Sequence, residues 1–255
     1  MEAAPRPDRG AINMAVDQAL FTSVQEGTTP VLRLYRWRPA CLSLGRHQRA
    51  LGVYDPERAR ARGVDVVRRP TGGLAVLHDA ELTYAVIAPL ALLGGPRVAY
   101  VRINRALVAA LAELGVAAEV GAGAAMQAPR PDAVHPCFQR PAPGEVVAAG
   151  RKLVGSAQRV ERHAVLQHGS ILLSGTQDAV LSLQGVGSGG AGGEVTLAEL
   201  LGELPPWPRL LGALRDAFAR TLGIRLAPAV LEPVERSAVA SELQRFGSDS
   251  WTWRR

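Results

Sequence analysis

The chain has 255 residues, 47% hydrophobic and 20% charged, enough apolar content to bury a core without disulfides or metals. No apolar run reaches the ~20 residues of a membrane helix, and the polar first ten residues lack a signal-peptide core. We therefore expect a cytoplasmic protein with no membrane partner. A net charge of +6 would suit nucleic acid, but the arginines are scattered among acidic residues. Acidic proteins are the expected partners instead.

Hydrophobic periodicity, turn residues and caps predict a series of helices and strands. Strands that alternate with helices but are joined in part by hairpins predict an α+β (α/β) fold, with a mixed central sheet and flanking helices. We divide the chain into a catalytic core (1–183), a glycine-rich flexible loop (184–195) and a C-terminal helical segment (196–255) that packs on the core. In chain order the expected elements are a helix over 10–24, strands over 31–37 and 39–45, a helix over 58–62, strands over 64–67 and 82–88, a helix over 97–114, a loop over 116–143, a hairpin around residue 150, a strand over 165–173, a helix capped at Thr196, a helix over 208–222, a short strand over 224–226 and a helix over 234–246.

Two residue types are rare enough to single out. The only lysine among 29 basic residues is Lys152, and an ammonium is a compact charge that donates to a carbonyl or carboxylate where a guanidinium will not serve. The two cysteines, Cys41 and Cys137, fit neither a redox pair nor a zinc site. Cys41 lies in an apolar strand and is expected to be buried, whereas Cys137 lies in the predicted loop, where a thiol with a lowered pKa can act as an acyl-transfer nucleophile. An incidental loop cysteine and a lysine kept by chance are the alternatives.

Small residues mark two places where a ligand can approach the backbone. Gly72 and Gly73 follow Pro70 in a tight loop between apolar strands, where Arg69 could hold a carboxylate or phosphate. The segment 155–157 follows Lys152 with little side-chain bulk. His78 and His168 lie at turns, and two histidines without obvious third ligands make a metal site improbable.

Taken together, these segments resemble the biotin/lipoate A/B protein ligase family, and within it the cysteine-dependent octanoyltransferase branch. The match covers about two thirds of the chain. The matching blocks are Asn-Met-Ala-Val-Asp at 13–17, Arg-Leu-Tyr-Arg-Trp at 33–37, Ser-Leu-Gly at 43–45, the loop at 68–79 with Glu-Leu-Thr-Tyr at 81–84, Cys-Phe at 137–138, the lysine segment at 150–158 and residues 166–172.

The resemblance implies the shared ligase catalytic-domain fold and an acyl group that lies near the Gly72-Gly73 loop. It assigns Lys152 to the acyl carbonyl and Cys137 to a thioester intermediate. The implied reaction moves octanoyl from octanoyl-acyl carrier protein to the lysine of a lipoyl-carrier domain, such as the glycine cleavage H protein or a 2-oxoacid dehydrogenase subunit, without a cofactor, metal or ATP. The expected substrate-binding residues are Arg69, Thr71, Gly72, Gly73, Leu74, His78, Gly155, Ser156, Ala157, His168 and Gly169.

Three other functions remain open. An ATP-dependent lipoate-protein ligase would not require Cys137, and Leu74 stands where the ligases carry a third glycine. A lipoyl or octanoyl amidotransferase between lipoyl domains differs only in its donor. A silent scaffold would have no reason to keep both Lys152 and Cys137. Acyl chain length, acceptor and oligomeric state are not decided by the sequence.

Overall fold

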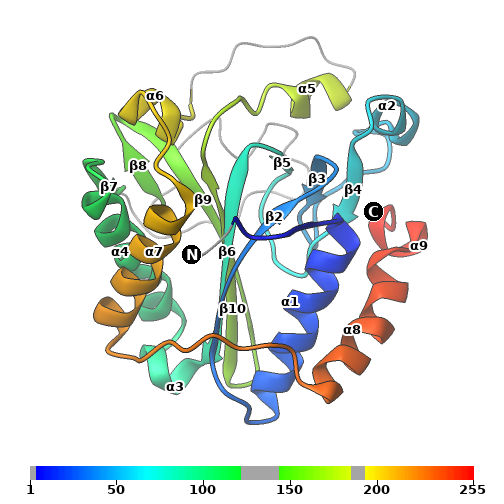
Figure 1. Cartoon of the computed structure of the whole chain (residues 1–255). Helices are drawn as coiled ribbons and strands as arrows, with labels where there is room; N and C mark the ends of the chain where they lie inside the picture. The colour runs from blue at the N-terminus through cyan, green and yellow to red at the C-terminus, as the bar shows by residue number, and fades with distance from the viewer. Residues whose placement is uncertain (1–3, 122–143, 185–192) are drawn as a thin grey trace.

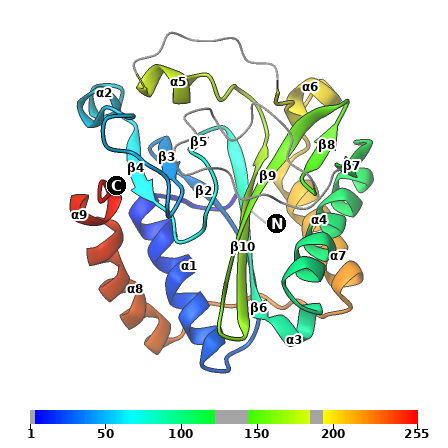
Figure 2. The same ribbon diagram turned by 180° about the vertical axis from the view of Figure 1, so that it is seen from behind.

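The computed structural model describes residues 4–121, 144–184 and 193–255, and its described strands form two sheets (Figures 1 and 2). In the larger, 7-stranded sheet the order is β1-β2-β6-β10-β9-β8-β7, and in the 3-stranded sheet it is β4-β3-β5. Parallel pairing joins β1 to β2 and β3 to β4, and the other pairs are antiparallel. Because parallel and antiparallel pairs occur together in the large sheet, the structure confirms the mixed central sheet that the sequence predicted. The strands are β1 (Pro7–Asp8), β2 (Val31–Trp37), β3 (Cys41–Leu44), β4 (Asp65–Arg68), β5 (Val76–His78), β6 (Glu81–Pro89), β7 (Ala118–Val120), β8 (Val146–Ala148), β9 (Arg151–Glu161) and β10 (Ala164–Leu172).

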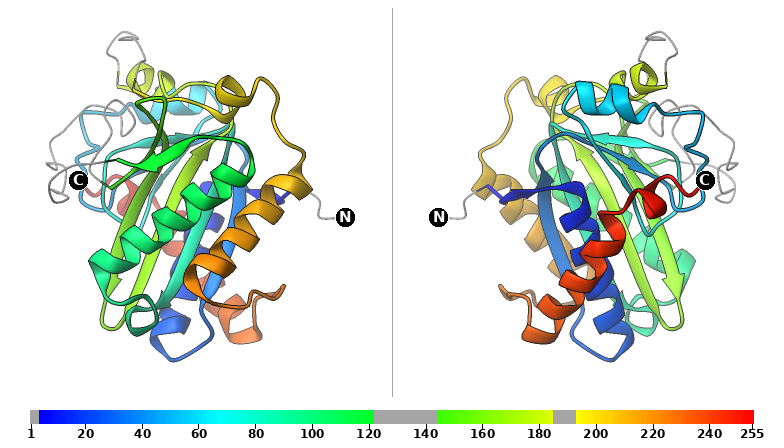
Figure 3. Two further views of the ribbon diagram at one scale, coloured as in Figure 1. Left: turned by 90° about the vertical axis from the view of Figure 1, so that its left-hand side faces the viewer. Right: turned by 90° about the vertical axis from the view of Figure 1, so that its right-hand side faces the viewer.

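Helices cover both faces of the large sheet (Figure 3). On one face α4 and α7 pack against each other, and on the other α1 lies between the sheet and α8. The described helices are α1 (Gly10–Gln25), α2 (Pro56–Ala61), α3 (Leu90–Leu93), α4 (Pro96–Glu113), α5 (Ala179–Leu183), α6 (Leu197–Leu201), α7 (Trp207–Leu222), α8 (Pro233–Phe246) and α9 (Asp249–Thr252).

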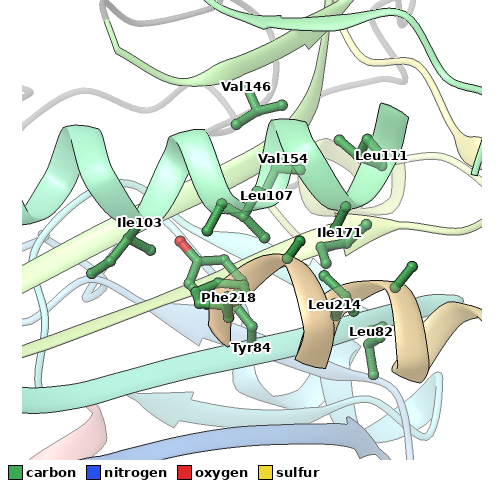
Figure 4. Packing of buried hydrophobic residues seen from close by; sticks show 14 of the residues in the cluster. Leu82, Tyr84, Ile103, Leu107, Leu111, Val146, Val154, Ile171, Leu214 and Phe218 are labelled. Atoms are coloured by element: carbon green, nitrogen blue, oxygen red, sulfur yellow. The ribbon is translucent and has the colours of Figure 1, made fainter. Parts of the chain in front are cut away.

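The central strand β6 serves two cores because its side chains alternate between the two faces of the sheet. Tyr84 enters the core beneath α4 and α7, where it lies 6.1 Å from Phe218 between ring centroids (Figure 4). Its neighbours Ala85 and Ile87 enter the core beneath α1. A strand that is buried on both faces has a nearly continuous run of apolar residues, and the sequence of β6 shows such a run.

The chain end is fastened to the β3–α2 connection. Ala50 and Leu51 donate backbone hydrogen bonds to the carbonyl of Arg255 at 2.8 Å. Buried Arg68 donates to the carbonyls of Thr252 and Gln48 at 2.9 and 2.7 Å. The C-terminal helices thus pack on the part of the chain that precedes residue 184, although the boundaries of the three segments stay a prediction.

The short elements β1, α3, α5 and α9 were not expected, and three expected segments differ in the structure. Residues 224–226 form no strand: after the left-handed C-cap Gly223, Ile224 and Leu226 pack against the core instead of pairing. The predicted loop over 68–79 contains β5, which pairs with β3. The predicted loop over 116–143 begins with β7, and its remainder from residue 122, like most of the glycine run, lies outside the described residues.

Candidate active site

A cavity lies where the small sheet meets the α1 face of the large one. The empty space among its lining atoms is about 440 Å³, a volume that includes space open to solvent. Strands β2, β3, β5, β6, β9 and β10 contribute to its wall together with α1 and the glycine loop. The lining residues are Met14, Tyr35, Trp37, Ser43, Arg69, Gly73, Val76, His78, Thr83, Gly155, Ser156, Ala157, His168, Gly169 and Ser170.

Most of the nominated substrate-binding residues meet at this cavity. Arg69, Gly73, His78, the segment 155–157, His168 and Gly169 line it. Thr71, Gly72 and Leu74 belong to the same loop without lining the cavity. The structure therefore gathers these residues in one place, while their roles in binding stay a prediction.

The packing beneath the cavity leaves no room for a side chain at Gly169. A Cβ at Gly169 would lie 2.4 Å from the Gly155 carbonyl oxygen and 2.7 Å from the ring of Tyr84. The Tyr84 hydroxyl is 2.7 Å from Ser156 Oγ. Burial raises the pKa of Tyr84 to about 12, so this hydroxyl stays neutral at physiological pH and positions Ser156. Gly169 thus permits the close packing of β9 on β10.

Arg69 shapes the glycine loop. Its guanidinium donates to the carbonyl of Gly72 at 2.6 Å, to that of Leu74 at 2.8 Å and to that of Ser43 at 2.9 Å. These bonds tie the loop to β3. The contacts assign Arg69 a positioning task that the sequence did not reveal, alongside its expected role in binding.

Two glycines make this tie possible. Gly73 has a φ of 90°, a conformation that favours glycine. A Cβ at Gly45 would lie 1.9 Å from the Gly73 carbonyl oxygen. The Ser-Leu-Gly block at 43–45 thus ends in glycine because the two backbones touch there.

His168 stands in a buried hydrogen-bonded chain. Its Nδ1 lies 3.0 Å from Asp17 Oδ2, and its Nε2 lies 2.6 Å from Thr71 Oγ. Asp17 also accepts from Arg33 at 2.7 Å and from the Tyr35 hydroxyl at 2.8 Å. The chain connects α1 and β2 to the glycine loop through one imidazole.

The protonation of this chain follows from its surroundings. Burial alone would raise the pKa of Asp17, but the Arg33 charge and the hydrogen bonds from His168 and Tyr35 outweigh it, and the pKa is lowered. Burial lowers the pKa of His168 and outweighs the opposing Asp17 carboxylate. Neutral His168 therefore donates a hydrogen bond through Nδ1 to ionised Asp17, and its Nε2 accepts a hydrogen bond from the Thr71 hydroxyl.

His78 has a structural setting. Its Nε2 lies 2.7 Å from Ser43 Oγ, and its Nδ1 lies 2.9 Å from Glu81 Oε1. The ring stacks on Trp37 with centroids 4.0 Å apart. Both ring nitrogens have protein partners, so His78 fixes the wall of the cavity while presenting part of its surface to it.

Lys152 forms a buried ion pair on β9. Its Nζ lies 2.6 Å from Glu145 Oε1, and the two side chains are 1% and 6% exposed. The backbone of Lys152 donates to Gly193 at 2.7 Å, which attaches the segment after the glycine run to β9. Lys152 is absent from the cavity lining and lies three residues before Gly155, which belongs to it. The sequence did not single out Glu145 as the lysine's partner.

Of the two cysteines, Cys41 lies among the described residues. Cys41 is fully buried on β3, and burial raises its thiol pKa well above the ordinary value, which makes it unreactive. Cys137 lies outside the described residues, so its predicted catalytic role has no geometry here. Among the described residues no group of three metal-ligating side chains occurs, and none of their helices has the length and hydropathy to cross a bilayer.

Comparison with known proteins shows the family of the chain. Residues 9–188 match the family model described as the lipoyl protein ligase A/B catalytic domain. The octanoyltransferase LipM of Symbiobacterium thermophilum is 37% identical, covering 100% of this chain and 97% of that protein. The protein of the same name from Kyrpidia tusciae is 38% identical over 96% of this chain and 95% of its own length.

Solved structures share the fold. Lipoate-protein ligase A bound with ATP superposes with a TM-score of 0.78 at 21% identity, over 99% of both chains. A bipartite lipoate protein ligase from Thermoplasma acidophilum, studied with its E2 lipoyl domain, gives a TM-score of 0.74 at 20% identity, over 99% of this chain and 97% of that one. The chain thus belongs to the lipoyl protein ligase A/B catalytic domain family. It is an acyltransferase of lipoate metabolism.

Proposed function

We propose that the protein moves an octanoyl group from octanoyl-acyl carrier protein, through a thioester on Cys137, to the lysine amine of a lipoyl-carrier domain in the cytoplasm. The supporting observation is the coincidence of full-length identity to octanoyltransferases with a cavity lined by the predicted substrate-binding residues. The neighbour studied with its E2 lipoyl domain supports that class of acceptor.

The reaction divides into two transfers. The Cys137 thiolate attacks the donor thioester carbonyl, a new sulfur–carbon bond forms, and the carrier thiolate leaves and takes up a proton. The deprotonated lysine amine of the acceptor then attacks the enzyme thioester, the carbon–sulfur bond breaks to release the Cys137 thiolate, and the nitrogen gives up a proton to solvent as the amide forms. Because each acyl donor is already a thioester, neither ATP nor a metal has to activate it.

The described residues supply the surroundings for both steps. The ammonium of Lys152 is a charge that polarises an acyl carbonyl brought within its reach. Backbone N–H groups of the glycine loop and of the segment 155–157 are the candidate donors to the oxyanion. Trp37, Val76 and Met14 give the cavity apolar wall for an alkyl chain.

The identity of the acyl donor decides between this function and ATP-dependent ligation. Lipoate-protein ligase A, which has the same fold, was solved bound with ATP. Purified protein and a lipoyl domain are incubated with octanoyl-acyl carrier protein, with a second, octanoylated lipoyl domain of different mass, or with ATP and free octanoate or lipoate, and the mass of the acceptor lipoyl domain is recorded. We expect modification with the carrier donor in the absence of ATP. Modification only with ATP and a free acid would make the protein a ligase, and modification only from an octanoylated lipoyl domain would make it an amidotransferase.

A further inference from the structure

Four segments far apart in the sequence bring basic side chains together beside the cavity. They are the β3–α2 connection, the middle of β9, the end of α8 and the chain end. Figures 1 and 2 show the chain end next to β4. Arg254 donates from its guanidinium to the Arg46 carbonyl at 2.7 Å. The arginine patch, as we name it, consists of Arg46, His47, Arg159, Arg245 and Arg254.

The charges in the arginine patch repel one another. Burial and then the charge of Arg159 lower the pKa of Arg46; the Glu161 carboxylate opposes them, and Arg245 acts in the lowering direction. Burial and then the charge of Arg46 lower the pKa of Arg254. Like charges gathered in one place destabilise the fold by mutual repulsion. Their presence is explained if they serve another purpose, such as binding a negatively charged partner.

Carboxylates neutralise only part of the arginine patch. Arg159 pairs with Glu161, and Arg245 pairs with Glu242 at 2.9 Å. Within the part of the chain that the structure describes, no carboxylate forms an ion pair with Arg46 or Arg254. The patch therefore presents excess positive charge to solvent.

Its guanidinium groups are nevertheless held in place. Arg254 and Arg245 lie 3.8 and 4.6 Å from the ring centroid of Trp251, a geometry stabilised by cation–π attraction. The Trp251 indole in turn donates to the Arg68 carbonyl at 2.8 Å. Groups that are already ordered lose less entropy when they bind a partner.

The arginine patch adjoins the cavity on two sides. The Arg46 backbone donates to the Thr71 carbonyl at 2.8 Å, and Gly45 touches the cavity-lining Gly73. Arg159 follows Ala157 by two residues on β9, so both side chains point to the same face of the sheet. A negatively charged partner bound to the patch would stand next to the cavity.

We propose that the arginine patch is the docking surface for the donor, an acidic acyl carrier protein that delivers its acyl group on a phosphopantetheine arm. This inference rests on the proposed function. Guanidinium groups bind both the carboxylates of such a carrier and the phosphodiester of its arm in bidentate fashion. The acceptor fits less well, because it must deliver a lysine amine whose protonated form these arginines repel.

The test measures the dissociation constant of octanoyl-acyl carrier protein for four variants of the full chain. They are Arg46→Glu, Arg254→Glu, their combination and Arg209→Glu, a matched charge reversal on α7 across the sheet. We expect about tenfold weaker binding for each patch variant and a smaller salt dependence, because rim charges steer and hold the partner. Arg209→Glu should stay within about twofold of wild type.

A second reading separates docking from chemistry. Acylation of the enzyme by octanoyl-N-acetylcysteamine, which has neither carrier protein nor phosphate, should proceed at the wild-type rate in the patch variants. Equal losses with both donors, unchanged carrier affinity in the double variant, or a loss confined to the lipoyl domain would overturn the docking surface. A wild-type protein that binds the carrier through the patch but is acylated by neither donor would instead refute the proposed transfer.

Discussion

Replacement of Glu145 by glutamine removes the carboxylate that lies 2.6 Å from the buried Lys152 ammonium. Two unit charges at that distance attract by about 6 kcal/mol at an effective dielectric constant of about 20. Desolvation of both groups offsets most of this attraction, so the intact pair adds little net stability. The variant keeps the desolvation of the ammonium and loses the attraction. We therefore expect Glu145→Gln to lower the free energy of unfolding by about 3–5 kcal/mol.

Urea denaturation followed by tryptophan fluorescence measures this loss. The matched control is Glu199→Gln, which removes the partner of the neighbouring Arg151, where the two side chains are 40% and 47% exposed. Solvent screens such a pair, and its loss should cost at most about 1 kcal/mol. Equal destabilisation by both variants would refute the conclusion that burial makes Lys152 dependent on Glu145.

Three further predictions concern the loop, the histidine and the buried thiol. Gly45→Ala places a Cβ 1.9 Å from the Gly73 carbonyl oxygen, whereas the Cβ of Gly72→Ala meets open space. Urea denaturation should show that the free energy of unfolding falls by about 1–3 kcal/mol for Gly45→Ala and changes by at most about 0.5 kcal/mol for Gly72→Ala. Similar values for the two variants would contradict the close backbone contact. Because burial lowers the pKa of His168, protonation favours the unfolded chain, and stability should fall as the pH drops from about 6.5 toward the lowered pKa, with a slope of up to about 1.4 kcal/mol per pH unit. His168→Gln should flatten that slope, and an unaltered slope would show that His168 is not held neutral. Iodoacetamide at about pH 8 should leave Cys41 unmodified in the native protein and modify it after unfolding, as peptide mass mapping can show; native labelling of Cys41 would mean that β3 opens to solvent.

The sequence predicted the elements whose signals are local. The helix over 208–222 follows from apolar residues three and four apart, and Leu210, Leu214 and Phe218 are buried in α7 as that spacing requires. The strand β6 follows from its apolar run. The strand predicted over 224–226 was wrong, although the segment has the same kind of apolar residues. A strand also needs a neighbouring strand with free backbone groups, and a short segment of sequence does not show whether such a neighbour exists.

The site was predictable as a set of segments and unpredictable as a network. Small residues at 72–73 and 155–157 indicated backbone approach, and the structure places both segments at the cavity. The partners of His168 are Asp17, 151 residues away, and Thr71, and such a distance in sequence leaves no local signal. Glu145 was missed for another reason: the hairpin around residue 150 was predicted, but Glu145 lies just before its first strand β8, after a Pro-rich stretch that carries no periodicity, so nothing pointed to its side chain as the partner of Lys152.

The central claim is that the acyl group passes through Cys137 without ATP. The most direct measurement is the intact mass of the protein after incubation with octanoyl-acyl carrier protein alone, before and after hydroxylamine, beside Cys137→Ala and Cys41→Ala. The account predicts a hydroxylamine-labile octanoyl adduct that persists in Cys41→Ala and is absent from Cys137→Ala. An adduct that persists in Cys137→Ala, or lipoyl-domain octanoylation that proceeds unimpaired in that variant, would contradict it.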